Sequence, residues 1–174
     1  MISTSYINSP VGPLFLGANE EGVVFLEFAS GSDKTARVAS LKKKLKDEFV
    51  EGDSPHLDEL KRQLSLYFEG KLNKFDLPLK LTGTEFQKKV WKALLDIPFG
   101  ETRSYAEQAK AIGKLSAVRA VANANGDNLI SIVIPCHRVI GSNGSLTGYG
   151  GGIDNKKWLL DHEKLQNTNP SAAD

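Results

Sequence analysis

The feature of this chain that most restricts its fold is a change of hydrophobic period after residue 28. Residues 6–18 have the pattern of two short strands around a Pro/Gly turn, and residues 23–28 form a third apolar strand. From Lys34 onward, apolar residues recur every three or four positions, which is the period of an amphipathic helix. The sequence therefore predicts an antiparallel meander followed by helices.

Two helices and a linker are predicted before residue 85. The helices cover residues 34–50 and 56–68, and the linker covers residues 71–84, where periodicity is weak. The apolar stripes are Val38, Leu41, Leu45 and Phe49 in the first helix and Leu57, Leu60, Leu64 and Phe68 in the second. The lysines at 42, 43, 44 and 46 are expected to form a solvated face.

A helix-turn-helix pattern dominates the second half of the chain. The predicted elements are helices over 85–95, 105–111, 117–125 and 155–163 and a strand or buried segment over 129–134. Gly113 marks the turn between the two central helices, and Ser104 and Ser116 are their expected N-caps. Such a pair can enter a DNA groove with the start of its second helix, although many helical hairpins share the pattern.

These elements predict an α/β N-terminal domain, with an antiparallel sheet plus helices, and a mainly α-helical, winged-helix-like C-terminal domain. The predicted boundaries are 1–78 for the first domain, a linker to about 84, 85–165 for the second domain and 166–174 for a flexible tail. With 40% hydrophobic residues, a chain of 174 residues can bury a core.

The composition says more about the cellular compartment of the protein than about its binding partner. A single cysteine excludes an internal disulfide, and neither a signal-peptide pattern nor a membrane-spanning run is visible. We therefore expect a soluble cytoplasmic protein, or a nuclear one in a eukaryote. A net charge of +1 neither indicates nor excludes nucleic acid, since a local patch can be basic on a balanced chain.

The single cysteine, Cys136, is the candidate for chemistry. It is followed by His137 and Arg138, and a glycine-rich stretch runs from Gly141 to Gly152. A thiol has a pKa of about 8.5 and needs cationic or hydrogen-bonding help to form the reactive thiolate near pH 7. A buried structural cysteine is the alternative, but the flanking residues favour a reactive one.

The motifs together resemble those of the O6-alkylguanine-DNA alkyltransferases, which are direct-reversal DNA repair proteins. The resemblance covers essentially the whole chain and is strongest from Phe86 to Glu163. The matching pieces are Phe86-Gln87-x-x-Val90-Trp91, Ile97 to Thr102 with Ser104-Tyr105, Arg119-Ala120-Val121, Ala124-Asn125-Gly126-x-Asn128, Ile134 to Ile140 and the glycine-rich segment through Tyr149.

The resemblance implies a single-use repair reaction. Cys136 would attack the alkyl carbon on O6 of guanine (less well O4 of thymine), and the thioether would remain on the protein. His137 would act on the thiol through a water molecule and would be oriented by Glu163. Tyr105 would donate to guanine N3, and Asn128 would orient the segment before the active site. No metal and no organic cofactor are expected.

The resemblance also implies how the substrate is bound. The partner would be double-stranded DNA, contacted in the minor groove with little sequence preference, and no obligate protein partner or membrane is implied. Arg119 would take the place of the flipped nucleotide, and Tyr149 would form a wall of the pocket. The backbone of Cys136 and Val139 would accept hydrogen bonds from the guanine amine. The backbone N–H of Gly150 would donate to O6. The other expected contact residues are Ser104, Ala120 and Gly151. Arg138 is expected to be structural.

Some positions depart from the family pattern, and other functions remain open. Glu85 and Leu129 stand where proline is usual, Ala122 where glycine is usual and Asp127 where arginine is frequent. These changes bear on DNA affinity rather than on the reaction. The alternatives are a non-catalytic sensor of alkylated DNA, a helix-turn-helix regulator and a cysteine hydrolase.

Overall fold

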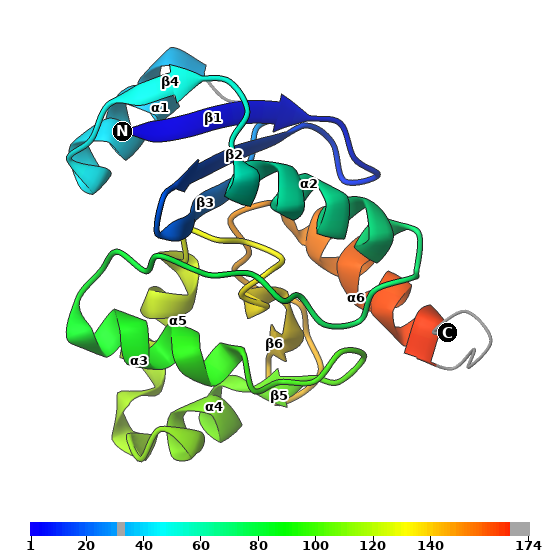
Figure 1. Ribbon diagram of the computed structural model, residues 1–174. Helices are drawn as coiled ribbons and strands as arrows, with labels where there is room; N and C mark the ends of the chain where they lie inside the picture. The colour runs from blue at the N-terminus through cyan, green and yellow to red at the C-terminus, as the bar shows by residue number, and fades with distance from the viewer. Residues whose placement is uncertain (31–33, 168–174) are drawn as a thin grey trace.

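The computed structural model describes residues 1–30 and 34–167, and Figure 1 shows the path of the chain. The N-terminal half is built on a sheet of four strands in the order β3-β2-β1-β4. The strands are β1 (Ile2–Ile7), β2 (Leu14–Asn19), β3 (Gly22–Phe28) and β4 (Phe49–Glu51). The first three pair antiparallel, so the predicted meander is confirmed.

The helix predicted over 34–50 is wrong at its C-terminal end. Helix α1 (Lys34–Leu45) stops before Lys46, whose φ of 54° is left-handed, and Phe49 begins β4, which pairs parallel with β1. Phe49 stacks on Phe25 with ring centroids 5.4 Å apart, so burial against the sheet determines its place. The spacing from Leu45 to Phe49 fits a helix equally well, and the sequence pattern could not separate the two.

Helix α2 (Pro55–Phe68) covers one face of this sheet, as predicted. Ser54 caps it by accepting from the backbone N–H of Leu57, and Pro55 occupies the first turn, where its missing N–H costs nothing. Leu57, Leu60 and Leu64 are fully buried under the helix. Burial of a leucine side chain contributes about 1.5–3 kcal/mol, so this stripe fixes α2 on the sheet.

The C-terminal half is mainly helical and confirms the predicted helix-turn-helix. Its helices are α3 (Glu85–Leu94), α4 (Tyr105–Ala111), α5 (Val118–Gly126) and α6 (Ile153–Asn167), with short 3-10 helices η1 (Leu115–Ala117) and η2 (Cys136–Arg138) and a two-stranded sheet of β5 (Arg103–Ser104) and β6 (Val139–Ile140). Ser104 forms a capping box with Glu107 at the start of α4. Gln108 and Asn125 exchange two buried amide hydrogen bonds, of 2.8 and 2.7 Å, and so lock α4 to α5.

Two sequence-based expectations are corrected in this half, and one open alternative is decided. Ser116 does not cap α5, because η1 precedes that helix and no side chain caps either of them. Of the two alternatives predicted for residues 129–134, the structure shows the buried segment: a run of turns with one isolated bridge from Ile130 to Leu26. Helix α6 continues to Asn167, so the start of the tail predicted over 166–174 is helical, and residues 168–174 lie outside the described part.

The two halves join along β3 and along α6. Leu26 of β3 donates its N–H to Leu129 O (2.8 Å) and accepts from Ser131 N–H (3.0 Å), so the sheet edge holds the turns that lead to Cys136. Helix α6 runs beside α2 (Figure 1), and Trp158 packs on Phe68 with ring centroids 5.8 Å apart. None of the described helices is long and apolar enough to cross a membrane.

Candidate active site

Cys136 is the first residue of η2 and is partly buried in the wall of a pocket. The turns before it include Ile132, a fully buried β-branched residue with a φ of 72°. This left-handed conformation costs roughly 1–2 kcal/mol for such a residue, and the surrounding structure must hold it in place. The hydrogen bonds to Leu26 on one side and to Asn128 on the other supply that constraint.

Asn128 connects the two ends of this strained segment. Its Oδ1 accepts from Ile130 N–H (3.0 Å), and its Nδ2 donates to Ile134 O (2.9 Å) and lies 3.4 Å from Cys136 Sγ. The side chain thus orients both the backbone before the cysteine and the sulfur itself. The role in the reaction that the resemblance implies for Asn128 stays a prediction.

The environment of Cys136 keeps the thiol protonated near neutral pH. Burial raises the pKa of Cys136, and the hydrogen bond from Asn128 and the charge of Lys156 only partly offset that effect. Because the thiolate is the nucleophilic form, the site needs a base that can take the proton.

His137 and Glu163 form a buried pair behind the cysteine. His137 is fully buried and Glu163 is 1% exposed, and His137 Nε2 lies 2.6 Å from Glu163 Oε2. Burial acts to raise the pKa of Glu163, but His137 and Arg138 outweigh it and lower that pKa well below its ordinary value. Since a carboxylate can only accept, Nε2 carries the hydrogen of the pair and Nδ1 has the free lone pair.

The free nitrogen of His137 is buried and unpartnered. Among the described residues, Nδ1 has no hydrogen-bond partner within the protein. Burial lowers the pKa of His137 despite the opposing effect of Glu163, which keeps the imidazole neutral and able to accept a proton. No direct contact between His137 and Cys136 Sγ is present, as expected for neighbouring side chains that diverge.

Arg138 is structural, as predicted. Its Nε donates to Glu163 Oε1 (2.7 Å), its Nη1 donates to Ile97 O (2.6 Å), and its guanidinium lies over the ring of Phe99. Arg138 thereby ties η2 to the loop after α3 and to α6. It also supplies the permanent positive charge that keeps Glu163 ionised.

A pocket of about 460 Å³ opens in front of Cys136. Its walls come from both halves of the chain, namely Glu27 and Phe28 of β3, one side of α1, Tyr105, the segment from Asn125 to Leu129 and the glycine-rich segment from Gly148 to Gly151. This volume lies within the range of small-molecule sites. The glycine-rich segment allows the backbone to approach such a ligand.

Tyr149 and Gly151 shape one wall of this pocket. The ring of Tyr149 packs edge-on against Phe28, with centroids 5.6 Å apart, and its hydroxyl is buried without a partner among the described residues. A Cβ on Gly151 would lie 2.4 Å from the Phe28 ring, whereas a Cβ on Gly150 would meet nothing within 4 Å. Gly151 is therefore required for close packing, and Gly150 leaves the pocket wide.

Tyr105 lines the pocket, and Lys156 lies buried beside it. Both donate to Thr147 O, with Tyr105 Oη at 3.3 Å and Lys156 Nζ at 2.9 Å. Lys156 Nζ also lies 6.0 Å from the centre of the Tyr105 ring. Burial lowers the pKa of Lys156, whereas the charge of a Cys136 thiolate raises it, so the ammonium and the sulfur interact.

The remaining predicted site residues do not line the pocket. Arg119 and Ala120 are exposed in the first turn of α5 and do not line the pocket. Ser104 caps α4, and Val139 is buried in β6, paired with Arg103. Asp127 accepts from Gln87 Nε2 at 3.2 Å, so this departure from the family pattern is tied to α3.

Sequence reasoning missed two residues that contact this site. Lys156 was hidden in an ordinary helix pattern, and Tyr67, whose hydroxyl lies 2.5 Å from Glu163 Oε2, was missed because it belongs to a helix of the other half. In the sequence, Tyr67 is notable only as a residue next to Phe68 on the apolar side of a helix. Such a position indicates a core residue rather than a residue of a reaction site. Among the described residues, no group of three or more His, Cys, Asp and Glu side chains could hold a metal ion.

Comparisons with known proteins agree with this geometry. Residues 2–81 match the model of the 6-O-methylguanine DNA methyltransferase ribonuclease-like domain, and residues 85–165 match that of the corresponding DNA binding domain. A methylated-DNA–protein-cysteine methyltransferase of Methanosarcina barkeri is 49% identical over 94% of this chain and 96% of its own length. One of Mycobacterium tuberculosis is 46% identical over 94% of this chain and 93% of its own.

Solved structures extend the likeness to three dimensions. The M. tuberculosis O6-methylguanine methyltransferase has a TM-score of 0.83 at 44% identity, covering 95% of this chain and 94% of that one. The structure of the M. tuberculosis OGT in complex with DNA has a TM-score of 0.81, and the match covers 94% of this chain and 94% of that one. The chain therefore belongs to the 6-O-methylguanine DNA methyltransferase family, DNA-binding repair enzymes that transfer a methyl group from DNA to a cysteine of the protein.

Proposed function

We propose that Cys136 is the acceptor and that its substrate is guanine alkylated at O6 in duplex DNA. The observation that carries this proposal is the position of the only cysteine in the wall of a pocket of about 460 Å³, beside the buried His137–Glu163 pair. In the reaction, the C–O6 bond breaks as the S–C bond forms, and the electron pair of the broken bond stays on the guanine. A thioether has no good leaving group, so each protein molecule acts once.

The proton of the thiol leaves through His137. A water molecule bridging Cys136 Sγ and the free Nδ1 lone pair would carry it, since the two side chains do not touch and Nδ1 has no partner among the described residues. Buried waters typically bind such otherwise unsatisfied polar atoms. Glu163 then stabilises the imidazolium, as in other base-activated nucleophiles.

The leaving guanine gains negative charge, and Tyr105, which lines the pocket, can donate to it. The hydroxyl of Tyr105 would donate to guanine N3, and a donor aimed at developing charge stabilises the transition state more than the ground state. The backbone of Cys136 and Val139 would accept from the exocyclic amine, and the Gly150 N–H would donate to O6. Tyr149 would pack against the base.

The substrate base must leave the stack before it can reach the sulfur. Extrusion costs a few kcal/mol, less for a poorly paired base. Arg119 is exposed at the start of the second helix of the helix-turn-helix, where a flat, permanently charged guanidinium can replace the base and bind its former partner. Small side chains such as Ala120 suit minor-groove binding, in which little sequence is read.

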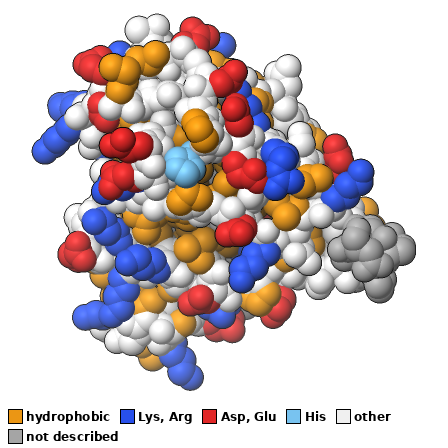
Figure 2. All heavy atoms as spheres, in the orientation of Figure 1, with side chains coloured by type: hydrophobic (Ala, Val, Ile, Leu, Met, Phe, Trp, Pro, Cys, Tyr) orange, Lys and Arg blue, Asp and Glu red, His pale blue; other side chains and the backbone are white. Residues whose placement is uncertain are grey.

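Figure 2 gives partial support for contact with a polyanion. On the face shown, Lys and Arg side chains gather over α3 and α4, interspersed with carboxylates. The lysines of these helices are Lys88, Lys89, Lys92 and Lys110. Contact with phosphates through such residues would make binding dependent on salt.

One experiment tests the proposal against its rivals. The protein is incubated with a duplex that contains O6-methylguanine, its intact mass is measured, and the modified peptide is mapped. One methyl group on Cys136, with one turnover per protein, is the expected result. Unmodified protein that binds the duplex would indicate a sensor or regulator, and many turnovers with unmodified protein would indicate a hydrolase.

A further inference from the structure

Tyr67 reaches the active site from the N-terminal half of the chain. It belongs to α2 and is 1% exposed, and its hydroxyl donates to Glu163 Oε2 at 2.5 Å. The partners are 96 positions apart in the sequence. The catalytic carboxylate is therefore hydrogen-bonded across the junction between the two halves.

The bond of Tyr67 falls on the same oxygen that holds His137. Glu163 Oε2 accepts from Tyr67 (2.5 Å), from His137 Nε2 (2.6 Å) and from Arg138 Nη2 (3.2 Å), while Oε1 accepts from Arg138 Nε (2.7 Å). Hydrogen bonds to an ionised acceptor are short and strong, and each one withdraws negative charge from the oxygen. Three donors on one oxygen share its charge, so the share left for His137 depends on Tyr67.

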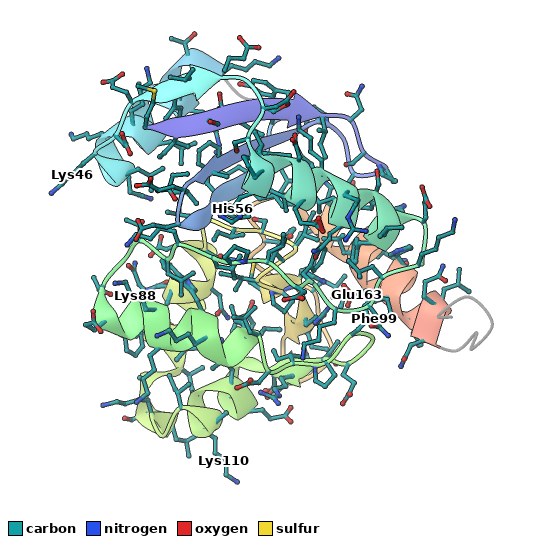
Figure 3. The ribbon with its side chains drawn as sticks, viewed as in Figure 1. Lys46, His56, Lys88, Phe99, Lys110 and Glu163 are labelled. Carbon is teal, nitrogen blue, oxygen red and sulfur yellow. The ribbon has the colours of Figure 1, made fainter. Side chains whose placement is uncertain are left out.

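Aromatic contacts fix the direction of the Tyr67 hydroxyl. The ring packs against Phe68, Phe75, Phe99 and His162, with centroid distances between 5.3 and 6.2 Å. The backbone oxygen of Tyr67 also accepts from His162 Nε2 at 2.7 Å. Figure 3 labels Glu163 and Phe99, which lie at this junction between α6 and the loop after α3. The hydroxyl is thus held on the carboxylate by packing rather than by chance.

We propose that Tyr67 is a positioning residue of the alkyl transfer, which acts through Glu163 to orient the carboxylate and to limit its basicity toward His137. This inference rests on the proposed function, because it takes His137 as the base for Cys136. The N-terminal half then sets the strength of the catalytic base. Its role goes beyond support of the second half.

The charged and titratable groups around His137 determine the sign of the expected effect. Glu163 and Lys156 of α6 and Arg138 of η2 act on it directly. Tyr67 of α2 and Tyr149 of the glycine-rich segment interact with Glu163, and Cys136 interacts with Tyr149 and Lys156. Burial lowers the pKa of His137, and Glu163 raises it. Removal of the Tyr67 hydroxyl leaves more negative charge for the imidazole, so the pKa of His137 must rise.

The test is the pH dependence of the reaction of Tyr67→Phe with free O6-benzylguanine, which needs no DNA. The rate requires neutral His137, so its acid limb follows the titration of that residue. The midpoint of this limb is expected to move to higher pH by about 0.5–1 unit, as a fraction of one charged hydrogen bond. Tyr6→Phe, which removes the hydroxyl of a 43% exposed tyrosine that makes no hydrogen bond to Glu163 or His137, is the matched control and should leave the midpoint in place.

A second variant is expected to shift the midpoint of the acid limb in the opposite direction. Tyr67→3-fluorotyrosine keeps the ring and its contacts but makes the phenol more acidic and a stronger donor, so the midpoint should move to lower pH. It also makes the test independent of whether Tyr67→Phe folds. An NMR titration of the His137 ring reports the same shift directly.

The outcomes separate the inference from the proposed function. If the unchanged protein takes up on Cys136 neither a benzyl group from the free base nor a methyl group from the O6-methylguanine duplex, the proposed function fails. If it reacts, and both Tyr67 variants keep the original midpoint with only a lower plateau rate or lower thermal stability, Tyr67 is structural and the inference is overturned.

Discussion

Glu163→Gln tests whether the buried carboxylate compensates the positive charge of the buried Arg138 guanidinium. The change keeps the size of the side chain but leaves the Arg138 guanidinium, only 8% exposed, without its anion. Removal of one partner of a buried ion pair costs about 3–5 kcal/mol. For a chain of this length, each kcal/mol corresponds to about 2–4 °C in Tm, so Tm should fall by roughly 6–20 °C.

The pH dependence of this loss follows from the lowered pKa of Glu163. A carboxyl whose folded pKa lies below its unfolded value, about 4.3, contributes its full stability above that value. This contribution declines as the pH falls below it, by up to about 1.4 kcal/mol per unit. The gap in stability between parent and variant should therefore be constant from pH 6 to 8 and narrow below about pH 4.3.

The assay is thermal unfolding of both proteins from pH 3 to 8, with Asp161→Asn as a matched control. Asp161 lies on the same helix in an exposed i,i+4 pair with Lys157, so its loss should change Tm little. A Glu163→Gln protein with the Tm of the parent at pH 7, or a gap that stays constant down to pH 3, would refute the argument.

Three further predictions concern the pocket and the flipping step. Arg119→Ala should slow repair in duplex DNA far more than reaction with free O6-benzylguanine, and equal losses would remove Arg119 from base extrusion. Gly151→Ala should lower stability by about 1–3 kcal/mol in thermal unfolding, because its Cβ meets the Phe28 ring at 2.4 Å, whereas Gly150→Ala, in open space, should not. Lys156→Met should raise the pKa of the Cys136 thiol, measured as an alkaline shift in its alkylation by iodoacetamide; an unchanged profile would show that the ammonium does not act on the sulfur.

The helices and the meander were predictable because their signals are local. The apolar stripe of α2 and the cap at Ser104 operate within a few residues, and the structure places both as expected. The strand β4 was not predictable, since Phe49 fits the helical stripe of α1 and joins the sheet only because Phe25 is there to cover it. The strained turns of residues 129–134 were equally invisible, because Leu26 holds them from another element.

The residues of the site also differ in how far the sequence could predict them. Cys136 and His137 are adjacent in the chain and were identified from the motif, whereas the contact of His137 with Glu163 was expected only from the resemblance. Lys156 and Tyr67 gave no signal, because a lysine in a helix and a tyrosine in an apolar stripe are ordinary. Their roles exist only where α6 and α2 meet η2.

The N-terminal half of the chain contacts the site at two separate places. Leu26 of β3 binds the backbone on both sides of Ile130 and so fixes the segment that carries Cys136. Tyr67 of α2 binds the carboxylate that carries His137. In the proposed reaction, the nucleophile and its base are thus positioned from different elements of one sheet-and-helix unit. Since the proton path between them must match within a hydrogen-bond length, a shift of that unit relative to the helix-turn-helix would disturb both ends at once.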